Sequence, residues 1–107
     1  MTDIILPADK FNNPIQAMGI GVTQLVNFGL SSVATNNALS KNTIIVRLVS
    51  TTSCFVRIST GTPTATASDM LLIAGVPEYF AVDGYKTLKV AALQSTAAGT
   101  LYVTEMV

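Results

Sequence analysis

The sequence predicts an all-β protein, a single-domain sandwich or jelly-roll-like barrel of about eight short strands. Apolar segments rich in β-branched residues recur roughly every 8–12 residues, and turn-forming residues separate them. No segment shows the period of an amphipathic helix. A chain of 107 residues accommodates one domain. We expect an N-terminal arm over residues 1–14 and the β-domain over residues 15–107, with jelly-roll, other Greek-key and up-and-down connectivities all open.

The first 14 residues predict an extended arm. Pro7 and Pro14 lack a backbone N–H and bias the residues before them towards extended conformations. Two interpretations stay open, a frayed terminus or an arm that lies over a neighbouring subunit. In the second, the interface would contain four apolar side chains, those of Ile4, Ile5, Leu6 and Phe11.

Residues 43–59 carry the clearest strand pattern. Two runs rich in Val and Ile, residues 44–49 and 54–58, flank a polar step of Ser and Thr, residue types that favour turns. We therefore predict a hairpin here. Both faces of its strands are apolar, so we expect one face to lie on the core and the other against a neighbouring strand, sheet or subunit.

Two arginines bear on the register and role of this predicted hairpin. Pairing Arg47 with Val56 is favoured, because pairing Arg47 with Arg57 would oppose like charges. Arg47 and Arg57 either mark the edge of the second contact or are simple solvated charges.

Six further strands complete the predicted fold. Their ranges are 22–28, a short strand within 31–40, 69–73, 78–82, 87–93 and 99–107. A turn at Asn36 and Asn37 follows the second of these, with a short helix over 37–40 as the alternative. Asp83-Gly84 predicts a tight hairpin, because glycine adopts positive φ at little cost.

The composition indicates a surface that is partly buried against other chains. Charged residues make up 11% of the sequence, against about 25% in typical soluble domains. Hydrophobic residues make up 50%, and the net charge is zero. We expect a homo-oligomer or assembly subunit rather than a monomer. The sequence has no basic stripe of the kind that binds nucleic acid, so we expect no nucleic-acid partner. It also has no apolar run that approaches the roughly 20 residues needed to span a bilayer, so we expect no membrane partner.

Residues that usually carry catalysis or bind metals are scarce, so we expect no enzyme, cofactor or metal site. The sequence has no histidine and one cysteine, Cys54, which is expected to be a small buried hydrophobe. The candidate catalytic carboxylates are Asp69, Glu78, Asp83 and Glu105, and their spacing matches no known signature. We expect Asp69 and Asp83 to lie in turns, and Glu105 to be solvated or paired with a lysine.

Four stretches together carry a resemblance to a known class of protein. They are residues 46–55, 63–72, 75–80 and 97–105. Their overall pattern resembles small structural proteins of tailed bacteriophages, often encoded near the major capsid protein. The resemblance covers about residues 43–107, and the first 40 residues do not add to it.

The resemblance implies a virion component made in the cytoplasm of a bacterial host. Phage decoration, or cement, proteins of this size are commonly β-sandwich or jelly-roll domains, often homotrimers, that bind the major capsid protein on the capsid surface and strengthen the shell. The alternative is a neck, tail or fibre-associated protein that recognises host glycan.

Overall fold

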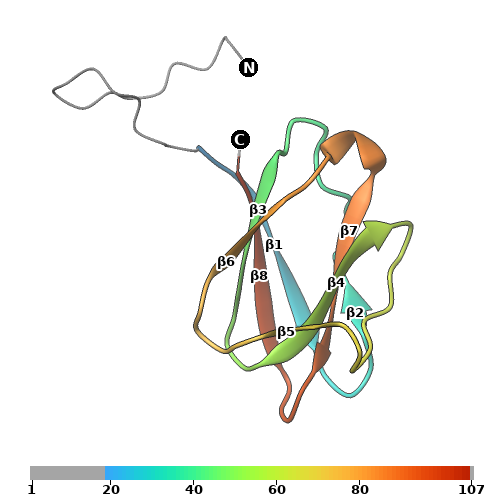
Figure 1. Cartoon of the computed structure of the whole chain (residues 1–107), viewed down its shortest axis with the longest axis vertical. Coiled ribbons are helices and arrows are strands. Elements are labelled where there is room, and N and C mark those ends of the chain that lie inside the picture. The colour runs from blue at the N-terminus through green and yellow to red at the C-terminus, as the bar shows by residue number, and fades with distance from the viewer. Residues whose placement is uncertain (1–18, 107) are drawn as a thin grey trace, which may run out of the picture.

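The structure is a computed structural model that describes residues 19–106. Eight strands form two antiparallel four-stranded sheets, which confirms the predicted all-β sandwich (Figure 1). The predicted arm, with Ile4, Ile5, Leu6 and Phe11, lies outside the described residues. The elements are β1 (Ile20–Phe28), β2 (Val33–Ala34), β3 (Ile45–Ser50), β4 (Cys54–Thr60), β5 (Met70–Leu72), β6 (Glu78–Ala81), the one-turn 3-10 helix η1 (Gly84–Lys86), β7 (Leu88–Gln94) and β8 (Gly99–Met106).

The strand order is that of a jelly roll, one of the connectivities that the sequence left open. One sheet has the order β1-β8-β3-β6 and the other β2-β7-β4-β5. The first strand pairs with the last, the second with the seventh, the third with the sixth and the fourth with the fifth. These four pairs together form one long antiparallel hairpin of eight strands. The hairpin is rolled up so that β8 also pairs with β3, and β7 with β4. Eight-stranded double-sheet jelly rolls recur in viral capsid and lectin domains.

The predicted hairpin over residues 43–59 is wrong in its pairing, although both of its strands form. The strands β3 and β4 belong to different sheets. Arg47 lies between Tyr79 and Thr104, and Arg57 lies opposite Ala91, so neither arginine faces Val56. The polar step crosses between the sheets because other loops bond its backbone: Thr51 N–H donates to Thr100 O at 3.0 Å, and the carbonyl of Ser53 accepts from Ser95 N–H at 3.2 Å.

The predicted tight hairpin at Asp83-Gly84 is also wrong. The strands β6 and β7 lie in different sheets, and η1 links them. Asp83 caps η1 by accepting a hydrogen bond from Tyr85 N–H at 3.1 Å. The left-handed residue here is Thr87, with φ of 58°. Glycine is needed at position 84 because the backbone of Ser40 and Lys41 lies against its Cα.

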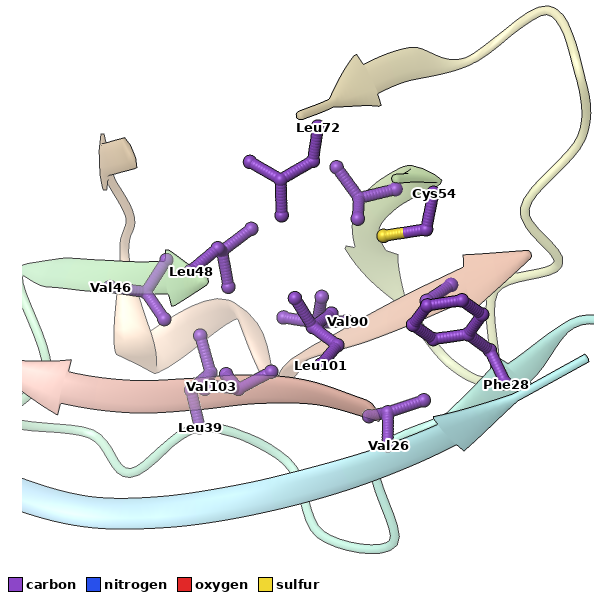
Figure 2. Close-up of a cluster of buried hydrophobic side chains, with 12 residues drawn as sticks. Val26, Phe28, Leu39, Val46, Leu48, Cys54, Leu72, Val90, Leu101 and Val103 are labelled. Carbon is purple, nitrogen blue, oxygen red and sulfur yellow. The ribbon is translucent and has the colours of Figure 1, made fainter. Parts of the chain in front are cut away.

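The core lies between the two sheets, where every second side chain of the central strands points inward (Figure 2). In β3 these are Val46 and Leu48, and in β8 they are Leu101 and Val103, all 0% exposed. The opposite sheet contributes Cys54, Val56, Val90 and Ala92. The prediction that one face of the runs at 44–49 and 54–58 lies on the core is therefore confirmed.

A matched pair of glycine substitutions tests the packing at η1. An added Cβ at Gly84 would overlap the Ser40 carbonyl oxygen and lie 2.8 Å from that of Lys41, and both are backbone atoms. We expect Gly84→Ala to lower the free energy of unfolding by about 2–4 kcal/mol through overpacking. Gly29→Ala, whose Cβ would meet nothing within 4 Å, should change it by about 0.5 kcal/mol or less. Urea unfolding followed by circular dichroism measures both, and equal losses would contradict this packing.

The thiol of Cys54 provides a second test of the core. Burial raises the pKa of this thiol, while a side-chain hydrogen bond with Ser50 lowers it by less. The side chain is 0% exposed. Because the thiolate is the reactive form, we expect a thiol reagent at neutral pH to label the folded chain only as fast as it unfolds. One equivalent should react at once in denaturant, and rapid labelling without denaturant would contradict a buried thiol.

Candidate functional site

The outer surface of the β1-β8-β3-β6 sheet is the candidate site, and we call it the open face. Register defines its members, because residues paired across neighbouring strands point to the same side of a sheet. They are Ile20, Thr23, Leu25 and Asn27 of β1, Thr100, Tyr102, Thr104 and Met106 of β8, Ile45, Arg47 and Val49 of β3, and Tyr79 and Ala81 of β6.

Apolar side chains form rows across the open face. Leu25 pairs with Tyr102, and Tyr102 pairs with Val49 on its other side. A second row runs from Ile20 through Met106 and Ile45 to Ala81. The large side chains are exposed to unusual degrees for apolar groups, with Ile20 at 77%, Leu25 at 55% and Tyr79 at 58%. Exposed apolar side chains gathered on one face in this way are typical of an interaction site.

Arg47 is the one charged residue among the described members of the open face. Its neighbours on the strands beside it are Thr104 and Tyr79, and Thr23 continues this row on β1. Arg47 is half-buried. The face therefore offers a guanidinium and several hydroxyls inside an apolar surround.

The outer face of the other sheet is partly covered by the chain itself. The loop between β4 and β5 reaches back past β7 to β2 (Figure 1), where Ala65 N–H donates to Ser32 Oγ at 2.8 Å. Ala65 is buried, and so is Ala91 of β7, which points to the same side as Arg57. Arg57 also lies on this face, exposed and 3.8 Å from Asp69 Oδ1. The two arginines singled out in the sequence thus lie on opposite faces of the sandwich.

The four candidate carboxylates do not form one site. Asp69 fixes a turn, as expected, by accepting from Thr66 N–H at 2.7 Å, and Asp83 caps η1. Glu78 lies in β6 and Glu105 in β8. Within residues 19–106, no group of three or more His, Cys, Asp or Glu side chains could hold a metal ion.

Glu105 is not solvated, and among residues 19–106 it pairs with no lysine, which corrects the expectation from sequence. Its side chain is 3% exposed. Its Oε1 accepts from Ser40 Oγ at 2.5 Å, Thr43 Oγ1 at 2.6 Å and Ser40 N–H at 3.2 Å. These bonds fasten the segment before β3 to the last strand. The alternation of β8 contained the signal, because Glu105 has the same parity as the inward Leu101 and Val103.

Substitution of Glu105 tests whether this buried hydroxyl cluster stabilises the fold. Glu105→Ala leaves the donors of Ser40 and Thr43 without their acceptor, so we expect the free energy of unfolding to fall by about 1–3 kcal/mol. Glu105→Gln keeps an acceptor oxygen and should cost less. Glu78→Ala is the control on a peripheral strand, expected to change stability by about 0.5 kcal/mol or less. Chemical denaturation measures all three, and a neutral Glu105→Ala would contradict the role.

The open face can bind a partner by removing apolar area from water, with Arg47 available to an acidic group. No helix within residues 19–106 has the length and apolarity needed to cross a membrane. Comparisons with protein-family models, curated protein sequences and solved structures found no match to this chain.

Proposed function

We propose that this chain is a structural protein of a phage virion, which binds and stabilises the capsid surface as a decoration protein. The observation that carries the proposal is the open face. It presents Ile20, Leu25 and Tyr79 to solvent in a chain with 11% charged residues. Such a surface is suited to burial against another protein.

The resemblance to phage structural proteins supports the same conclusion. The resembling stretches 46–55, 75–80 and 97–105 include most of β3, β6 and β8. These are three of the four strands that carry the open face. The jelly-roll strand order adds support by analogy of fold alone, because the same fold hosts many functions.

The mechanism is stabilisation through several weak contacts at once. The open face of each subunit binds the capsid, and Arg47 donates hydrogen bonds to an acidic side chain of the major capsid protein. The apolar residues of the 1–14 segment supply a further contact. In a homo-oligomer, each contact after the first forms at high effective concentration, so modest single affinities add up. A homotrimer is the form that the resemblance implies. A homo-oligomer bound across neighbouring capsomers resists their separation.

Cosedimentation with undecorated capsids of the encoding phage tests the proposal. Purified chain should pellet with capsids and saturate at a fixed ratio. Tyr102→Glu places a charge at the centre of the apolar row, and we expect it to weaken binding at least about tenfold.

Tyr85→Glu is the matched control. Tyr85 is 74% exposed in η1, away from the open face, so binding should stay unchanged. Circular dichroism checks that both variants fold. Binding to host polysaccharide without binding to capsids would replace the decoration role with a tail or fibre role.

A further inference from the structure

The first strand is a long sheet edge that lacks charges and proline. β1 lies at the edge of its sheet, paired on one side with β8. Its nine residues include no charged residue and no proline. Apart from its ladder with β8, no backbone–backbone hydrogen bond links β1 to another described residue. The side chain of Gln24 donates to Asn37 O at 3.0 Å and accepts from Asn37 N–H at 3.1 Å. An unpaired edge of this kind is a template for another strand.

The other three edges of the sandwich are protected. β2 has two residues and β5 has three, lengths that offer little to a partner strand. β6 has four residues, contains Glu78 and follows Pro77. Charges, prolines and short length are the means by which natural sheets avoid edge-to-edge pairing. β1 has a bulge between Ile20 and Thr23, which is another such means, but it has no charge or proline and its regular part runs from Thr23 to Phe28, and this distinguishes its edge from the rest.

We propose that β1 pairs in antiparallel fashion with β1 of a second copy of this chain, about a two-fold axis at Leu25. The register of β1 with β8 is continuous from Thr23 to Phe28, and the bulge lies before it. An axis at Leu25 opposes Leu25 to its own copy and Thr23 to Asn27, so no like charges meet. A net charge of zero adds no repulsion between the copies.

The apolar row on the open face identifies a second copy as the occupant. Leu25, Tyr102 and Val49 form a row that ends at the free edge of β1. In the two-fold pair, this row continues directly into Leu25, Tyr102 and Val49 of the other copy. The β1-β8-β3-β6 sheets of the two copies then form one eight-stranded sheet with a continuous open face. The short outer edges formed by β6 stop further addition, so the assembly closes as a dimer.

This inference goes beyond the proposed function, because it concerns self-association in the absence of any capsid, and it makes the free chain a dimer where the resemblance implies a homotrimer. Sedimentation equilibrium of the purified full chain should give twice its 11.2 kDa mass. Leu25→Lys opposes two lysines across the axis, and the dimer dissociation constant should rise at least about tenfold. Leu25→Glu alone should act in the same way. Mixing the two variants should restore the dimer, since opposite charges then meet at the axis.

Two controls separate β1 pairing from other contacts. Tyr79→Lys changes the opposite edge of the same open face and should leave the dimer intact. Ile5→Lys should also leave it intact. A monomer or trimer of the unaltered chain, failure of the mixed variants to associate, or loss of the dimer in either control would overturn the inference. Hydrogen exchange of the β1 amides should slow with protein concentration, in step with the dimer.

Discussion

Burial of alternate side chains between the two sheets is the interaction on which the rest of the structure depends. Because successive residues of a strand point to opposite sides, placing Leu48, Leu101 and Val103 in the core fixes what their neighbours present outside. Tyr102 and Arg47 lie on the open face for this reason. A one-residue slip would exchange the two sets, so the core that stabilises the domain also specifies the surface that we propose binds a partner.

The strands could be predicted from the sequence because their signals are local. The runs at 44–49 and 54–58 contain enough β-branched residues to be recognised, and β3 and β4 lie within a residue or two of the expected ranges. Their pairing could not be predicted in the same way. In this jelly roll the partners of β3 are β6 and β8, with paired residues about 30 to 60 positions further on. A connection that crosses between sheets contains the same Ser and Thr residues as a hairpin turn.

The candidate site shows the same division. The apolar outer sides of β3 and β4 were visible in the alternation, whereas the surface shared with other chains, expected from the scarcity of charges, stays a prediction. The difference between the two outer faces was not visible, since it depends on the β4–β5 loop reaching Ser32. Glu105 was mistaken for a solvated charge because its charge was given more weight than its position, which alternates in step with the core residues of β8. Its donors, Ser40 and Thr43, lie more than sixty residues away, and no local pattern announces them.

The charged residues are distributed unevenly between the two sheets of the sandwich. Arg57 and Lys89 point outward from the β2-β7-β4-β5 sheet, and Asp83 and Lys86 lie at η1, whereas Arg47 alone serves the open face among the described residues. Hydration is therefore concentrated away from the open face and from β1. A charge-poor chain gains little by spreading its few charges evenly, because each one within an interface costs desolvation. Concentrating them elsewhere keeps the molecule hydrated and leaves one sheet, with its long edge, for the association that we propose.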